Sequence, residues 1–202
     1  MVKICGMTCE EDAALAAELG ADAVGLMFYE GSPRCVTFEK AASIVRQLPP
    51  WVAKVGVFVN PTPELVIGSI AAAGLTMLQF HGEEEPEFCS QFGLMSIKAF
   101  RIKDRESLAT ISSYRTDAWL LDSYVPGVAG GTGHTFNWNL AKEVRDWGRP
   151  VFLAGGLTSE NVGEAVRIVA PYGVDVSSGV ESTPGRKDPE KMRQFMKAVG
   201  RE

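Results

Sequence analysis

Residues Val151 to Glu181 read VFLAGGLTSENVGEAVRIVAPYGVDVSSGVE, and this stretch decides the fold. Its first four residues form a short apolar run between a proline and a glycine pair, which is typical of a buried strand. Thr158 is a favourable N-cap for a helix that runs to position 169. Residues 172–176 form a second strand, which breaks at Ser177-Ser178-Gly179. The stretch therefore predicts a strand, a helix and a strand in succession.

Small residues end both of these strands, at Gly155, Gly156, Ser178 and Gly179. Such residues leave backbone N–H groups open and keep Cβ atoms away, which is what a phosphate group requires. The alternative is two tight turns that need glycine only for their backbone geometry. Two such turns in successive late strands favour a phosphate site, because (β/α)8 barrels place theirs there.

The same unit repeats along the rest of the chain. Because the strands are mostly continuous apolar runs separated by helices, we expect a parallel sheet with right-handed crossovers. The expected strands are residues 2–5, 21–27, 52–59, 76–80, 94–100, 118–121, 151–154 and 172–176. We therefore predict an α/β protein whose residues 1–202 form a single (β/α)8 TIM barrel. A doubly wound sheet is the alternative, but no G-x-G-x-x-G follows the first strand.

Polar residues at the expected helix starts predict where the helices begin. Thr8 with Glu11 has the pattern of a capping box, and proline follows two of the other caps. The expected N-caps are Thr8, Thr37, Thr62, Asn137, Thr158 and Asp188. We also expect helices over residues 84–92 and 104–112, and a glycine-rich loop over 127–133 that forms a lid or an anion cradle.

Composition excludes several classes of function. The 202 residues carry a net charge of -5, which argues against a general nucleic-acid binder. No apolar run approaches the roughly 20 residues of a membrane span, and no signal peptide is visible. Cys5, Cys9, Cys35 and Cys89 form neither a zinc pattern nor a clear disulfide framework. We expect free thiols and a cytoplasmic protein.

In a barrel, polar side chains at the C-terminal ends of strands face the active site. The candidates are Lys3, Cys5, Arg34, Asn60, Gln79, His81, Arg101, Asp122 and Ser123. Cys5 is either a reactive thiolate or a small buried apolar residue, and Lys3 lies on the same strand face. Asp122 is either a turn cap or a partly buried general acid, since burial favours the protonated form of a carboxyl group.

Two further candidates have equally open interpretations. Arg34 could bind a carboxylate through a bidentate contact or could be a solvated loop residue. His81 could act as a base or could be a hydrogen-bonded histidine at the end of its strand. Asp175, in the eighth strand, could pair with another group inside the barrel.

Nine short motifs, in order, make the chain resemble the phosphoribosylanthranilate isomerase family along nearly its whole length. They are Val2–Thr8 (VKICGMT), Ser32–Arg34 (SPR), Val55–Asn60 (VGVFVN), Gln79–Gly82 (QFHG), Leu120–Ser123 (LLDS), Gly130–Gly133 (GGTG), Leu153–Leu157 (LAGGL), Val174–Glu181 (VDVSSGVE) and Pro184–Asp188 (PGRKD). Met7, Phe80 and Asn137 depart from the residues that are usual in that family.

The resemblance implies a (β/α)8 barrel without metal or cofactor that isomerises N-(5-phosphoribosyl)anthranilate by an Amadori rearrangement in tryptophan biosynthesis. It implies Cys5 as general base, Asp122 as general acid and Arg34 as the residue that contacts the anthranilate carboxylate. The phosphate would lie on Gly155, Gly156, Ser178 and Gly179, and His81 would join the substrate-binding set. The expected partner is this phosphorylated small molecule, with no nucleic acid or membrane, and the expected assembly is a monomer or a homodimer.

Two other classes of function stay open at this stage. A sugar-phosphate aldolase or decarboxylase could share the barrel, and an aldolase would need a Schiff-base lysine inside it. Lys3, Lys54 and Lys98 all lie in expected strands. A non-catalytic barrel would bind the same phosphorylated ligand without turning it over.

Overall fold

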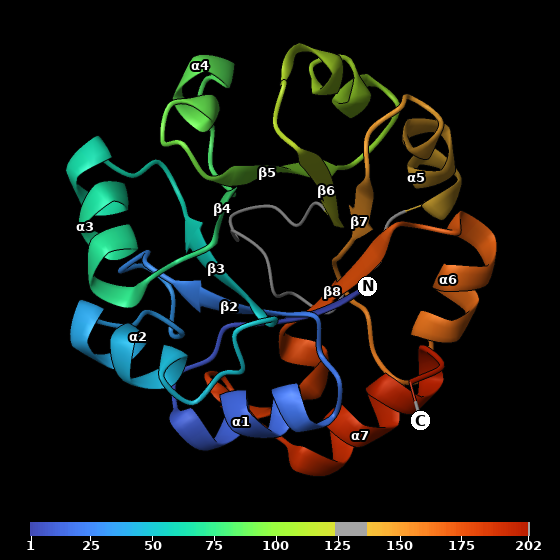
Figure 1. The fold of residues 1–202 in the computed structure, drawn as a ribbon. Coiled ribbons are helices and arrows are strands. Elements are labelled where there is room, and N and C mark those ends of the chain that lie inside the picture. Colours follow the sequence, from blue (N-terminus) through green and yellow to red (C-terminus); the bar gives the residue numbers. More distant parts are fainter. Residues whose placement is uncertain (124–136, 202) are drawn as a thin grey trace.

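The computed structural model, which describes residues 1–123 and 137–201, contains a closed barrel of eight parallel strands surrounded by helices (Figure 1). The prediction of a (β/α)8 TIM barrel is confirmed. The strands are β1 (Val2–Cys5), β2 (Ala23–Met27), β3 (Ala53–Phe58), β4 (Met77–Phe80), β5 (Met95–Ile102), β6 (Ala118–Ser123), β7 (Val151–Leu153) and β8 (Gly173–Val176). Parallel pairing of β1 with β8 closes the barrel, and Lys3 lies opposite Asp175 in that register.

Helices follow most of the strands and cover the outside of the barrel (Figure 1). The α-helices are α1 (Glu10–Glu18), α2 (Phe38–Val45), α3 (Pro63–Ala73), α4 (Pro86–Ser90), α5 (Trp138–Arg145), α6 (Val162–Val169) and α7 (Pro189–Ala198). Three 3-10 turns are η1 (Glu106–Leu108), η2 (Ile111–Ser113) and η3 (Ser178–Val180). Among these helices none has the length and apolar character that crossing a bilayer requires.

Four of the predicted N-caps are confirmed. Thr37 and Thr62 accept hydrogen bonds from backbone N–H groups three residues on, at 3.2 and 3.3 Å. Asn137 accepts from the N–H of Asn139, and Asp188 accepts from two N–H groups of α7. Each side chain satisfies N–H groups that the first helical turn leaves unpaired.

Two predicted caps are wrong. The Thr8 hydroxyl donates to the carbonyl of Gly185 instead, so α1 begins after Cys9 and the capping box does not form. Thr158 lies in a turn closed by Asn161, whose Oδ1 accepts from the Thr158 N–H at 2.9 Å, and α6 begins only after that turn. In both places another side-chain hydrogen bond forms in place of the expected cap, and the helix begins later than predicted.

Two predicted helices are shorter or different. Residues 84–92 contain only α4, because Glu84 turns its carboxylate back to the N–H of Gly82 at 3.0 Å. Residues 104–112 form η1 and the beginning of η2 rather than one α-helix. The sequence analysis also missed an antiparallel hairpin after β8, made of β9 (Glu181–Thr183) and β10 (Arg186–Lys187). The loop expected over residues 127–133 lies outside the described residues.

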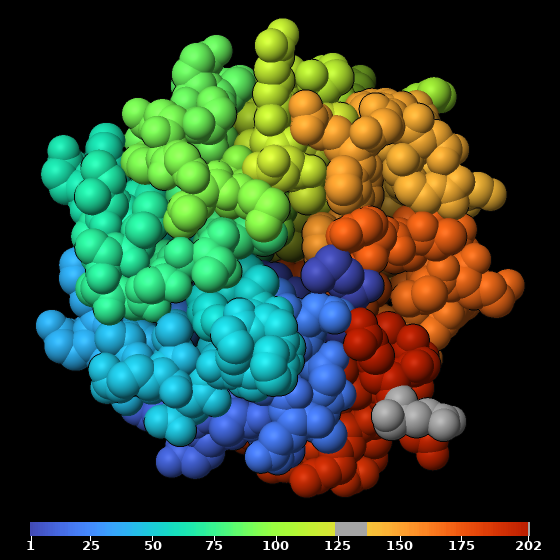
Figure 2. Space-filling view, viewed as in Figure 1, coloured from blue at the N-terminus to red at the C-terminus, as the bar shows by residue number. Residues whose placement is uncertain are grey.

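The core has two layers, because successive strand residues face alternately out to the helices and into the barrel. The outer layer holds large side chains such as Phe58, Phe80 and Phe195, which are fully buried. Inside the barrel, Ile97 of β5, Leu120 of β6 and Phe152 of β7 form one apolar cluster below the ends of their strands. Figure 2 shows the face where the N-terminus lies, with the first residues near its centre. The polar inward side chains gather at the opposite end, where the strands finish.

Candidate active site

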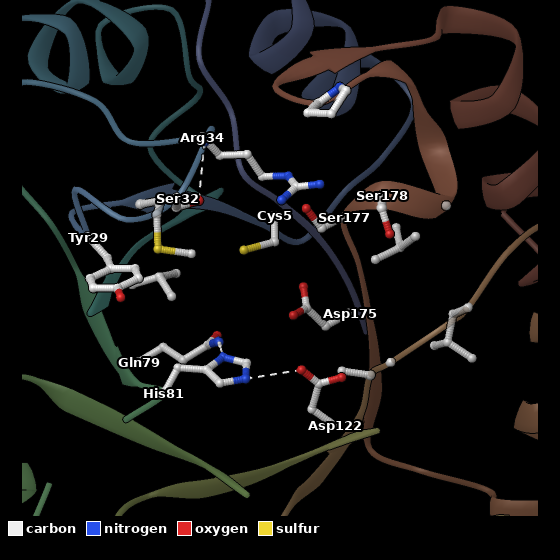
Figure 3. A pocket seen from close by; sticks show the side chains of 18 of the residues that line it. Cys5, Tyr29, Ser32, Arg34, Gln79, His81, Asp122, Asp175, Ser177 and Ser178 are labelled. Atoms are coloured by element: carbon white, nitrogen blue, oxygen red, sulfur yellow. Dashed lines mark hydrogen bonds and ion pairs between the residues drawn. The ribbon is translucent and has the colours of Figure 1, made fainter. Parts of the chain in front are cut away.

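A cavity of about 460 Å³ opens at the C-terminal ends of the strands (Figure 3). This volume falls in the range of small-molecule sites. All eight residues that the sequence analysis selected for catalysis or binding line it: Cys5, Arg34, His81, Asp122, Gly155, Gly156, Ser178 and Gly179. Residues separated by most of the chain therefore meet in one place.

Cys5 ends β1 with its thiol directed into the cavity (Figure 3). Below it, the Lys3 ammonium donates to Asp175 at 2.9 Å, and both side chains are buried. Burial raises the pKa of the Cys5 thiol, the Lys3 charge lowers it, and the Asp175 charge raises it again, so the net pKa lies above its ordinary value. A thiolate formed here is therefore a strong base in a site that water scarcely reaches.

Asp122 lies near the end of β6 and forms a chain of hydrogen bonds with two residues of the β4 end (Figure 3). Its Oδ2 is 3.1 Å from Nε2 of His81, and Nδ1 of His81 is 3.1 Å from Nε2 of Gln79. The other carboxylate oxygen accepts from the Ser123 N–H at 2.8 Å. His81 is thus hydrogen-bonded on both ring nitrogens, and Asp122 has an imidazole as its immediate proton partner.

Arg34 reaches the cavity from the loop between β2 and α2, and Glu181 of β9 holds it through two hydrogen bonds. Nε and Nη2 donate to the two carboxylate oxygens at 2.8 and 2.7 Å, which is a bidentate pair. Lys187 of β10 donates to the same carboxylate at 2.9 Å. Burial raises the pKa of Glu181, but the hydrogen bonds and charges of Arg34 and Lys187 outweigh it and leave the pKa below its ordinary value. The resulting cluster has one more cation than it has carboxylates.

The turns after β7 and β8 place their backbones side by side on the cavity wall. Gly155 and Gly156 have φ values of +80° and +63°, a conformation that favours glycine. A Cβ atom at Gly179 would lie 1.9 Å from the carbonyl oxygen of Leu157, so the two turns touch. Within the described residues, the N–H groups of Gly156 and Gly179 have no recorded protein acceptor. The glycines therefore serve the turn geometry, and both turns line the cavity.

Of the other candidates from the sequence analysis, Gln79 and Asp175 line the cavity, whereas Lys3, Asn60, Arg101 and Ser123 do not belong to its lining. Asn60 accepts from the Glu83 N–H at 2.7 Å and shapes a loop, while Arg101 donates to the His81 carbonyl at 3.2 Å. Glu181 was missed because its partner Arg34 lies 147 residues away, where no local pattern indicates the contact. Lys187 was missed with it, because its role here is to donate to that same carboxylate. Tyr29, another missed residue of the lining, belongs to the same loop as Arg34.

The three strand lysines do not offer a Schiff-base amine to the cavity, since none of them lines it. Lys3 is paired with Asp175, and Lys98 donates to the Glu84 carboxylate at 2.7 Å. Lys54 donates to two carbonyl groups at 3.2 Å. An aldolase of the Schiff-base type, which needs a neutral amine beside its substrate, does not fit this arrangement.

Comparison with known proteins identifies a family through its sequence model and its curated relatives. Residues 2–198 match the family model for N-(5'-phosphoribosyl)anthranilate (PRA) isomerase. A curated relative of that name from Geobacter sulfurreducens is 53% identical over 196 residues, covering 97% of this chain and 96% of the relative.

Solved structures agree in fold. The phosphoribosyl anthranilate isomerase of Thermotoga maritima is 42% identical, with a TM-score of 0.92, and the match covers 98% of this chain and 97% of that one. A phosphoribosyl anthranilate isomerase in complex with reduced 1-(o-carboxyphenylamino)-1-deoxyribulose 5-phosphate is 40% identical, with a TM-score of 0.89 and the same coverage.

Proposed function

The chain belongs to the N-(5'-phosphoribosyl)anthranilate isomerase family, and from this membership we propose how its cavity carries out the reaction. It is an isomerase of tryptophan biosynthesis that converts N-(5'-phosphoribosyl)anthranilate to 1-(2-carboxyphenylamino)-1-deoxyribulose 5-phosphate. The observation that carries the proposed roles is that a thiol, Cys5, and a carboxyl group, Asp122, line one cavity with an open pair of glycine turns.

Asp122 is the general acid in this proposal. It protonates the ring oxygen of the ribose as the carbon–oxygen bond opens to a Schiff base. Cys5, as thiolate, then removes the proton from C2 and gives an enolamine, which tautomerises to the ketone. An acid and a base that reach one sugar from different strands, β6 and β1, suit these two steps.

The ends of the substrate are held by groups that take no part in bond making. The turns at Gly155-Gly156 and Ser178-Gly179 supply backbone donors to the phosphate. Arg34 faces the anthranilate carboxylate with the donors that Glu181 leaves free, and no partner of its Nη1 is recorded among the described residues. These contacts contribute positioning, which brings C2 and the ring oxygen to Cys5 and Asp122.

The substitution Asp122→Asn tests the acid role, because it keeps the shape of the side chain but removes the proton that it would donate. We expect kcat to fall at least about a hundredfold, the scale of a lost general acid, with little change in affinity for a product analogue. Fluorescence decay of freshly made phosphoribosylanthranilate measures turnover. If Asp122 only caps the turn through the Ser123 N–H, asparagine caps equally well and kcat survives.

We also propose a cytoplasmic location and a monomeric or homodimeric assembly. The four cysteines are free, which fits a reducing compartment. Light scattering of the purified protein distinguishes the two assemblies. The same turnover assay excludes or supports the remaining alternative, a barrel that binds the phosphorylated ligand without converting it.

A further inference from the structure

Gln79 has a buried polar atom without a partner. The side chain belongs to β4, is 1% exposed and lines the cavity, and its Oε1 makes no hydrogen bond within the described residues. Its Nε2 meets Nδ1 of His81 (Figure 3). An unsatisfied buried amide oxygen is costly, so this orientation needs a reason. The reason lies in what the amide does to the imidazole.

The orientation of the amide decides which ring nitrogen of His81 carries a proton. When Nε2 of Gln79 donates to Nδ1, that nitrogen is bare, the ring proton is on Nε2, and it is donated to an ionised Asp122. When the amide rotates by half a turn, Oε1 faces Nδ1 and accepts its proton. His81 and Asp122 then share one further proton between Nε2 and Oδ2. The amide occupies nearly the same volume in both orientations, so packing favours neither.

The two arrangements differ by one proton. In the first, the His81–Asp122 pair carries one negative charge and has no proton for the substrate. In the second, the pair is uncharged overall and Asp122 can donate. The proton enters from solvent and leaves to the ring oxygen of the substrate, so each amide orientation corresponds to one stage of the reaction.

We propose that Gln79 is a positioning residue that controls, through the tautomer of His81, whether Asp122 holds the proton it donates. This inference rests on the proposed role of Asp122 as the acid. In this proposal the Gln79 amide rotates when the His81–Asp122 pair gains or loses its proton. A side chain with both a donor and an acceptor is needed for this, even though one of the two lacks a partner in each orientation.

Several other ionisable groups lie around the hydrogen-bonded residues Gln79, His81 and Asp122. Arg101 of β5 pairs in register with Asp122 and donates to the His81 carbonyl. Lys98 and Glu84 form a buried pair beside Gly82. Further ionisable side chains line the cavity from β1, the β2–α2 loop and β8: Cys5, Tyr29, Arg34 and Asp175. The lining residues that follow β7 include no ionisable side chain. Substitutions of Gln79 do not remove any of the ionisable groups named here.

The test uses imidazole nitrogen NMR of protein labelled with ¹⁵N-histidine. The sequence has two histidines, so His134→Asn leaves His81 as the single labelled ring. In the otherwise wild-type protein, we expect the ring proton on Nε2 at high pH and a proton on Nδ1 at low pH. An ionised glutamate in Gln79→Glu can only accept at this position, so we expect the proton on Nδ1 of His81 to persist where the wild-type ring carries its proton on Nε2.

Turnover gives the second readout. Gln79→Met keeps the volume but removes both polar ends, and we expect kcat to fall about tenfold with KM changed less than about twofold, as for other residues that orient a reacting group. Gln79→Glu should restore much of that loss, with the pH dependence of kcat moved in the same direction as the tautomer change. Ile97→Val, in the neighbouring strand at the same level, controls for packing and should change neither the tautomer nor the pH profile.

An unchanged His81 tautomer and pH profile in Gln79→Glu would overturn the inference, as would a Gln79→Met variant that loses only thermal stability. The NMR measurement needs no turnover, so it judges the control by Gln79 separately from the acid role. If Asp122→Asn keeps its kcat, the proposed acid fails whatever the tautomer does. If Asp122→Asn is inactive but Gln79→Glu changes neither the His81 tautomer nor the pH profile of kcat, the acid role stands and the inference about Gln79 is wrong.

Discussion

Glu181 is the residue whose replacement should reveal most about how Arg34 is held. Its side chain is 5% exposed, and its carboxylate accepts from Arg34 twice and from Lys187 once. Glu181→Gln keeps the shape of the side chain and one good acceptor. It also leaves two cations, one of them fully buried, without their shared anion. The substitution therefore removes a charge but almost no volume.

The expected loss of stability follows from this burial. Breaking a buried ion pair from one side costs about 3–5 kcal/mol, and the retained amide oxygen places this variant near the lower end. For a chain of this length, 1 kcal/mol lowers Tm by about 2–4 °C, so we expect a fall of about 6–12 °C. KM should rise as well, because Arg34 loses the brace that points its free donors into the cavity.

The pH dependence has a defined sign. Because the folded-state pKa of Glu181 lies below its ordinary value of 4.5, its contribution to stability is complete above pH 4.5. It is lost as the pH falls through the lower folded-state value, so the Tm difference between wild type and Glu181→Gln should shrink in acid.

Thermal unfolding between pH 3 and 8 measures the loss of stability and its pH dependence, and steady-state kinetics at neutral pH measures KM. Glu164→Gln is the matched control, since it is the same chemical change at an exposed pair, with Arg167 3.7 Å away. We expect it to alter stability by less than about 1 kcal/mol. If Glu181→Gln unfolds within the error of that control and its KM is unchanged, the proposed bracing of Arg34 is refuted.

Three further predictions concern the other walls of the cavity. Arg34→Ala should raise KM for the substrate more than the inhibition constant of inorganic phosphate, since a charged hydrogen-bond contact contributes about 1.5–3 kcal/mol; equal losses would place Arg34 at the phosphate end. Gly179→Ala places a Cβ atom 1.9 Å from the Leu157 oxygen and should weaken phosphate inhibition about tenfold or more, because the touching turns must separate; unchanged inhibition would exclude this turn from the phosphate site. Burial holds the pKa of Cys5 above 9.0 despite Lys3, so kcat/KM should keep rising through pH 8–9 as the thiolate forms; a plateau below pH 8 would argue against Cys5 as the base.

The fold could be predicted from sequence because its signals are local. Each strand is an apolar run between breakers, and Thr37 and Thr62 cap helices through N–H groups only three residues away. The two predicted caps that do not form, Thr8 and Thr158, make other hydrogen bonds instead. Thr8 bonds to Gly185, 177 residues further along the chain, and no window around Thr8 contains that information.

The candidate site divides in the same way. Strand ends brought Cys5, His81 and Asp122 to the cavity as expected, because all parallel strands of a barrel finish at one mouth. The partners of those side chains were less visible. Glu181 stands in a recognisable motif, but its bond to Arg34 depends on a hairpin that the apolar pattern did not show. Side-chain pairing across the barrel is therefore the part that required the three-dimensional structure.

The charges around the cavity connect substrate binding to the acid. The chain is acidic overall, yet within the described residues three cations, Arg34, Lys187 and Lys3, form ion pairs here with two carboxylates, Glu181 and Asp175, while Asp122 pairs with His81. A substrate that carries a carboxylate and a phosphate brings negative charge into this cavity. Negative charge nearby favours the protonated form of an acid. Substrate binding should thus promote the arrangement in which the His81–Asp122 pair holds its extra proton, so the acid is loaded when the ring that needs the proton arrives.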